Sequence, residues 1–294
     1  MEGMANSSVM AGKGIGSDYA SGMEVMLIGA GIGVGADLEK NKEADADISG
    51  VGVQGGLILG TNLAWMDTQK ILGLETNKLN LYLNFMKYDM EQKTGDTQAT
   101  FDSTSMGFHV SYDWKKGSSN KLLGWGGIKI HTGYEYNKTE LNFTSTINET
   151  VSQTPVAGTT YSSTVVANPF AAINVNTHSI PLEISTSLRF LYLFSLYGGL
   201  GADYSTGTAT GKGDLNSNSA PVTCAGAACS PGPGNVGSIE TSANIDGKGK
   251  ANPFLFRGFA GLQLNLPFVR IFVQGDKALG NDLVGATAGV RFVY

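Results

Sequence analysis

The chain contains four arginines, and each lies in a stretch where polar and apolar residues alternate. They are Arg189, Arg257, Arg270 and Arg291. In every case the arginine falls on the face opposite the apolar side chains. A guanidinium group pairs with carboxylates through a fixed fork of N–H donors, which suits it to enclosed ion pairs. We therefore expect all four arginines to point into one shared polar interior.

Further charged residues are predicted to face the same interior. The candidates are Glu135, Glu183, Asp203, Asp276, Lys129 and His131, which Asp113 can join. One interpretation is a salt-bridge network that fills the interior, and the other is a constriction that selects anions. The two differ in whether each arginine has a carboxylate of its own.

Two further patterns suggest chemistry and have simpler explanations. The stretch from Gly29 to Gly35 has glycine at every second position, whereas a dinucleotide-binding turn needs glycines at positions one, three and six. We interpret it as a strand whose inner face is formed by glycine. Cys224 and Cys229 are close enough in sequence for a small disulfide loop, and no further His or Cys nearby supports a metal site. We expect no metal and no cofactor.

The elements that position these residues are strands, because the dominant period is two. In 79–85, leucine and phenylalanine alternate with asparagine and tyrosine. The pattern predicts ten strands, at 23–38, 46–61, 76–91, 99–114, 122–142, 178–190, 193–206, 250–265, 268–278 and 282–294.

The connections between these strands differ in length on the two sides of the sheet. Those after even-numbered strands are mostly short, whereas 143–177 and 207–249 are long, polar loops after odd-numbered ones. Tight periplasmic turns and long extracellular loops are typical of outer-membrane barrels. We predict a closed, antiparallel, up-and-down transmembrane β-barrel over 23–294 with both termini periplasmic, or twelve strands if 143–177 holds a hairpin. Residues 1–22 are expected to be a flexible segment that is periplasmic or threads the lumen.

Composition supports this fold class. Charged residues make up 15% of the chain and Gly reaches 41, yet no run of 18 apolar residues occurs. The net charge of −5 argues against a nucleic-acid partner. The first residues lack the charged start and apolar run of a signal peptide, so we expect a mature chain.

Aromatic residues supply an independent indication. Trp65, Trp114 and Trp125 all fall at predicted periplasmic strand ends, as an aromatic girdle requires. The last strand ends with Val290, Phe292 and Tyr294 on its outward face. This ending resembles the C-terminal signal of the Gram-negative outer-membrane β-barrel superfamily. The resemblance implies recognition by the barrel assembly machinery and contact with outer-membrane lipid and lipopolysaccharide.

For function the sequence favours a structural or docking barrel, with a filled lumen, whose loops or N-terminal segment bind a protein partner. The alternative is a narrow channel for ions or small anionic solutes. A hydrolase is a weaker alternative: His109-Val110-Ser111 is similar to the His-x-Ser of outer-membrane deacylases. In that family the pair faces lipid, whereas here it is expected to face the lumen.

Overall fold

Ten strands close into one antiparallel ring, as the sequence predicted. The computed structural model describes residues 1–20, 25–38, 48–66, 69–119, 122–156, 159–220, 223–226 and 240–294. The ring closes because β1 pairs with β2 on one side and with β15 on the other. Its strands are β1 (Met26–Asp37), β2 (Gly50–Asn62), β5 (Leu79–Thr94), β6 (Thr97–Ser119), β7 (Leu123–Ser145), β9 (Thr159–Phe190), β10 (Phe194–Ser219), β13 (Phe254–Asn265), β14 (Val269–Ala278) and β15 (Leu283–Val293).

The alternation of side chains separates an apolar outer wall from an enclosed lumen. On β1, Ile28, Ile32 and Val34 are exposed, while the glycines between them face inward. The same outward exposure holds for large apolar residues on the other strands, among them Leu57, Phe108, Leu182, Leu200 and Phe256. A closed ring with an apolar exterior satisfies all backbone groups internally, which is what a lipid environment demands.

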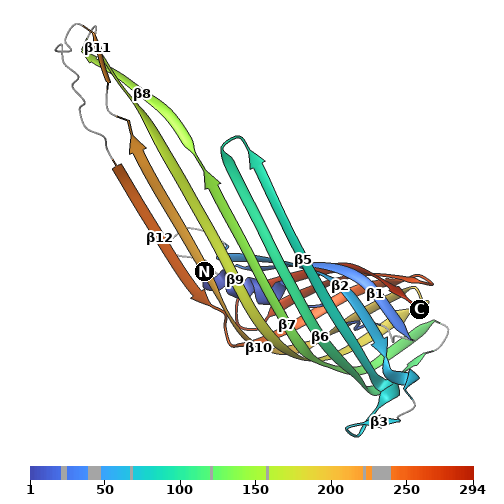
Figure 1. The fold of residues 1–294 in the computed structure, drawn as a ribbon. Coiled ribbons are helices and arrows are strands. Elements are labelled where there is room, and N and C mark those ends of the chain that lie inside the picture. Colours follow the sequence, from blue (N-terminus) through green and yellow to red (C-terminus); the bar gives the residue numbers. More distant parts are fainter. Residues whose placement is uncertain are drawn as a thin grey trace.

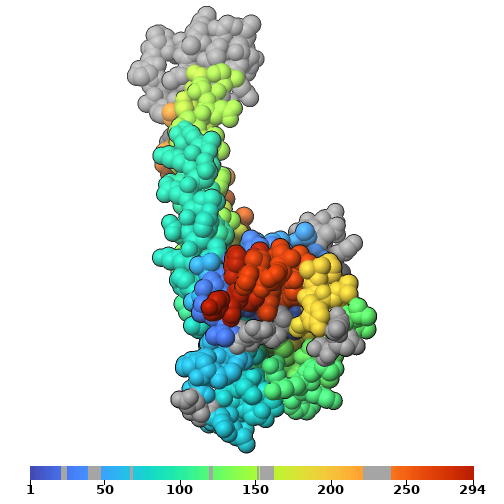
Figure 2. Space-filling view, turned by 90° about the vertical axis from the view of Figure 1, so that its right-hand side faces the viewer, coloured from blue at the N-terminus to red at the C-terminus, as the bar shows by residue number. Residues whose placement is uncertain are grey.

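Five ring strands are longer than the others. The upper parts of β5, β6, β7, β9 and β10 continue beyond the barrel as a tall sheet, joined by β8 (Ile147–Val156), β11 (Thr223–Gly226) and β12 (Glu240–Lys250) (Figure 1). Figure 2 shows this sheet, here called the blade, standing clear of the barrel. The stretches 143–177 and 207–249, expected as loops, are therefore largely strand among the described residues. The alternation signal was missing because both faces of these upper strands mix polar, small and apolar residues.

The blade leaves the ring count at ten. β8 and β11 pair with β9, and β12 pairs with β10, so all three lie outside the ring. The twelve-strand alternative is thus wrong, although 143–177 does contain part of the β8–β9 hairpin.

The opposite rim consists of short connections. β9 and β10 are joined by a tight turn in which Leu191 and Tyr192 have φ of 51° and 59°, as in a type I′ hairpin. The longer connection after β2 holds η1 (Leu63–Trp65), β3 (Lys70–Ile71), β4 (Leu74–Glu75) and η2 (Thr76–Lys78). Among the described residues no helix is long and apolar enough to cross a membrane.

Residues 1–20, here called the plug, fill the lumen. Helix α1 (Glu2–Ala11) is buried over most of its length, and the following residues run along the barrel toward the short-turn rim (Figure 1). Glu2 lies against Gly249 near the blade, whereas Tyr294 bonds Met26 at the opposite rim. The first and last residues therefore lie at opposite ends of the barrel, which differs from the expectation that both termini are periplasmic.

Candidate functional site: the plug inside the barrel

The inner face of β1 and β2 is a track of glycines on which α1 lies. A Cβ atom on Gly33 would overlap the carbonyl oxygen of Ala11, and one on Gly35 would overlap that of Ser7. On β2, a Cβ on Gly52 would come within 2.5 Å of the backbone nitrogen of Ser8. Only the absence of side chains lets the helix approach the wall this closely.

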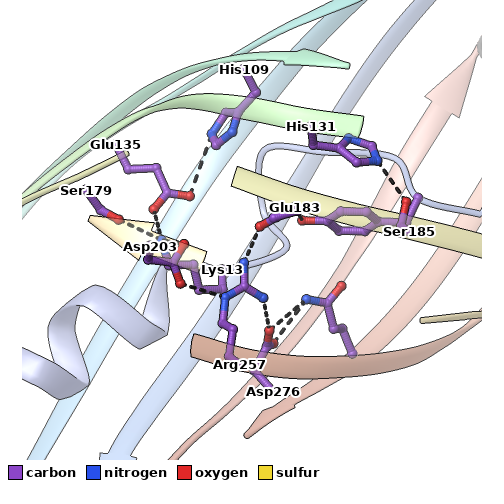
Figure 3. A network of polar contacts seen from close by, with 12 residues as sticks. Lys13, His109, His131, Glu135, Ser179, Glu183, Ser185, Asp203, Arg257 and Asp276 are labelled. Atoms are coloured by element: carbon purple, nitrogen blue, oxygen red, sulfur yellow. Dashed lines mark hydrogen bonds and ion pairs between the residues drawn. The ribbon is translucent and has the colours of Figure 1, made fainter. Parts of the chain in front are cut away.

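Below the helix, Arg257 is surrounded by carboxylates from three other strands (Figure 3). Its Nε donates to Asp203 at 2.9 Å and one terminal nitrogen donates to Asp276 at 2.5 Å. The other terminal nitrogen bonds Glu183. The side chain of Arg257 is wholly inaccessible to solvent, so these bonds replace its entire hydration. Four carboxylates, those three and Glu135, are called the acid cluster below.

The plug contributes a second cation to the acid cluster. Lys13 Nζ lies 2.7 Å from Glu135 and 3.2 Å from Asp203, and it donates to Ser179 Oγ at 2.8 Å (Figure 3). Its side chain is fully buried. Thr287 of the wall also donates to the backbone carbonyl of Lys13, at 2.5 Å. The plug is thus bonded to the wall through both side chain and main chain.

Nearer the short-turn rim the charges are reversed. Arg270 and Arg291 lie directly opposite each other on β14 and β15, an arrangement of like charges that is unfavourable by itself. The plug residue Asp18 lies 2.8 Å from Arg270 and 3.7 Å from Arg291. Arg291 also donates to the carbonyl of Ser17 at 2.5 Å. One carboxylate of the plug therefore offsets two cations of the wall.

Tyr19 lies near the end of the plug and connects the acid cluster with the neighbourhood of Asp18. Its hydroxyl donates to Glu183 at 2.7 Å. Its ring contacts the rings of Tyr197, Phe259 and His131 at centroid distances of 5.7, 4.8 and 4.8 Å. A buried tyrosine of this kind combines a large apolar contact with a satisfied hydroxyl.

The plug and the wall are complementary in charge. Where the wall carries a surplus of carboxylates the plug places Lys13, and where the wall carries paired arginines it places Asp18. Buried ion pairs therefore join the plug to the wall at two levels of the lumen, one at the acid cluster and one at Arg270 and Arg291.

A family model for Lsa36-like proteins matches residues 1–294. The chain belongs to the Lsa36-like family. Solved structures similar to it include the translocator domain of the autotransporter NalP from Neisseria meningitidis, with 7% identity, 98% of this chain and 93% of that chain covered, and a TM-score of 0.34. A Pseudomonas aeruginosa FadL homologue matches with 6% identity, 100% and 98% coverage and a TM-score of 0.29. Acinetobacter baumannii CarO matches with 12% identity, 90% and 97% coverage and a TM-score of 0.27. No curated protein sequence matches.

This Lsa36-like chain has the architecture of a closed transmembrane β-barrel. That statement rests on its own closed strand pairing and apolar outer wall. In the lumen, the structure brings Arg257 together with Glu183, Asp203 and Asp276, while Glu135 reaches the same cluster through Lys13.

The other lumen candidates lie around the plug. Lys129 donates to the Asp18 carbonyl at 3.4 Å and lies 3.9 Å from Asp113, and His131 bonds Ser185 at 2.9 Å. Arg189 is half-buried near the end of β9. Lys13, Asp18 and Tyr19 were not predicted from the sequence as lumen residues. A usable signal was present, because charged side chains are rare in residues 1–20 and Lys13 and Asp18 are two of them.

The three tryptophans and the aromatic residues at the end of β15 lie at the strand ends that the sequence predicted. Trp65, Trp114 and Trp125 all lie near the rim where β2 and β6 end and β7 begins, and the Trp125 indole donates to Thr186 at 2.9 Å. Val290, Phe292 and Tyr294 are exposed on the outer side of β15 or just beyond it. Their roles as girdle and assembly signal remain predictions.

Two further candidates from the sequence are the pair His109 and Ser111 and the pair Cys224 and Cys229. His109 and Ser111 of the Lsa36-like barrel are buried and face the lumen, away from lipid. Cys229 lies outside the described residues, so the disulfide with Cys224 remains a prediction.

Proposed function

We propose that this Lsa36-like barrel is a closed docking protein: the plug seals the lumen, and the blade binds a protein partner outside the membrane. The observation that carries the proposal is the fully buried Lys13, bonded to three side chains of the wall. A segment held by buried ion pairs and by main-chain bonds is a structural filling rather than a loosely held gate.

The blade supports the docking half of the proposal. A tilted transmembrane strand needs only about 9–11 residues, whereas β9 has 32 and β10 has 26. β12 has a partner on one side only within the described part of the sheet, so its outer edge offers free backbone groups to an added strand. Ile245 on this strand is 74% exposed, which is the kind of apolar surface a partner covers.

Two measurements test the two halves. Single-channel recording of the refolded barrel in a planar bilayer is expected to show no steady conductance. A photoreactive amino acid at Ile245 in intact cells is expected to give a discrete protein adduct, and the same group at Phe256 on the outer wall is the matched control that meets lipid. Steady conductance would contradict the sealed lumen, and identical adducts at the two positions would contradict docking.

A second candidate is a channel for small ions that opens when the plug is displaced. It is favoured by one observation: the lumen accommodates an α-helix, whose diameter with side chains is about 10 Å, so the empty barrel would be wide enough for hydrated ions.

A further inference from the structure

The wall of the barrel has a seam between β2 and β5. The register between the two strands runs from Leu57 to Asn62 of β2 and ends there. Above it, β2 continues to Gly50 in register with β1, while β5 continues in register with β6. The upper half of β2, from Gly50 to Gly56, therefore has no register with β5.

At the seam, β5 and β6 pass over the outer side of β2. Gly55 occupies an outward position, and a Cβ there would lie 2.5 Å from the sulfur of Met86 on β5. Ser105 of β6 donates to the carbonyl of Gly55 at 2.6 Å. The inward face of the blade thus lies against the outward face of upper β2.

A cavity of about 130 Å³ lies between these two faces. Its lining comes from the plug, β2, β6, β7 and β9 and is mostly apolar, with Ser8 and Thr139 as its polar side chains. The aliphatic and thioether side chains are Met4, Val51, Val53, Leu141, Ile173 and Val175. An enclosed cavity of roughly 150 Å³ lined by apolar side chains takes up a molecule the size of benzene. The chemistry of the lining therefore selects a hydrocarbon group.

The cavity borders the outward face of upper β2. Val53 lies directly opposite Val34 of β1, and both side chains are exposed on the outer surface, at 42% and 45%. Val51, which also lines the cavity, is 51% exposed. These outward-facing valines extend the apolar outer face of β1 and upper β2 to the edge of the cavity.

We propose that this seam cavity binds the end of an acyl chain of a membrane lipid. A lipid fits better than a neighbouring segment of the protein, because the β1–β2 connection at 39–47 consists mainly of charged residues and asparagine. Open apolar walls of this kind are unfavourable in water, and an acyl chain covers them with no demand for hydrogen bonds. Since Met4 belongs to the plug, the bound chain would contact the stopper and the blade together.

The test uses the full chain in lipid nanodiscs that contain a phospholipid with a diazirine at the end of one acyl chain. After irradiation, we expect the peptides that contain Val53 and Leu141 to carry at least fivefold more label than the peptide that contains Leu200 on the outer wall of β10. Equal labelling of the three peptides would overturn the proposal.

Variants that fill the cavity make the test specific. Val53→Trp is expected to lower labelling at Leu141 at least fivefold, and Leu141→Trp to lower it at Val53. Leu200→Trp is the matched control on exposed outer wall and is expected to leave both peptides unchanged. The heat-modifiable mobility of each variant verifies that it is folded. Undiminished labelling in both folded filling variants would refute the site, and labelling by a free diazirine fatty acid but not by the phospholipid would refute a membrane lipid as its source.

Discussion

Lys13 is the residue through which the plug and the acid cluster depend on each other. Lys13→Met would leave buried Glu135 without its nearest cation and would leave Asp203 with Arg257 alone. Removing one partner of a buried ion pair costs ~3–5 kcal/mol, because the other charge stays buried. We expect a loss of that order in the free energy of unfolding, measured by denaturant titration of the refolded barrel in detergent.

Lys138 supplies the control for this change. It lies 2.7 Å from Glu140, but its side chain is 44% exposed, and exposed ion pairs contribute little to stability. Lys138→Met is therefore expected to change the free energy of unfolding little. An equal effect of the two substitutions would mean that the pairs of Lys13 are no more important than a surface contact.

The ion pairs of Arg257 and Lys13 could be predicted from the sequence only in part. Alternation assigned Arg257, Glu183, Asp203 and Asp276 to one interior face, because a charge on the lipid face is costly. It could not show that one arginine serves three of these carboxylates, since that depends on the stagger between strands. Nor could it pair Lys13 with Glu135, which lie 122 positions apart in the chain.

At the scale of elements, the glycine track of β1 and β2 determines where α1 can lie. Gly33→Ala and Gly35→Ala each place a methyl group where backbone atoms of the plug now lie. Because backbone cannot rotate away as a flexible side chain can, we expect the helix to be displaced. The expected result is intermittent single-channel opening where the unaltered barrel is silent.

Gly275→Ala is the matched control for the track. Gly275 lies on the exposed outer face of β14, and a Cβ there would meet nothing within 4 Å. The Gly275→Ala barrel is expected to fold as the unaltered barrel does and to show no channel opening. Suppose that Gly33→Ala and Gly35→Ala fold correctly and show no channel opening. The close fit between the glycine track and α1 would then not be required to keep the lumen closed.

The ten ring strands could be predicted from the sequence, whereas the blade could not. Ten strands were found because one face of each meets lipid and must be apolar along the band. The blade above the band has no such demand, so the upper halves of β9 and β10 look like polar loops in sequence. The all-glycine face of β1 was recognised, but its purpose, to receive a helix, follows only from the folded plug.

At the scale of the whole molecule, removal of the plug should convert a closed barrel into a selective pore. A chain lacking residues 2–20 would keep the acid cluster with Arg257 as the only cation bonded directly within it in the described wall. Four carboxylates around one guanidinium attract cations, and low-dielectric walls strengthen that field. We therefore expect steady conductance with a preference for cations, measured as a reversal potential across a salt gradient.

The same deletion combined with Asp203→Asn and Asp276→Asn tests which charges set the preference. Fewer carboxylates at the cluster should reduce the cation preference while conductance persists. A preference for anions in the deleted chain would instead assign control to Arg270, Arg291 and Lys129 near the short-turn rim. A deleted chain that folds but stays silent would mean that the wall collapses onto the vacated space, and the plug would then be a structural core as well as a stopper.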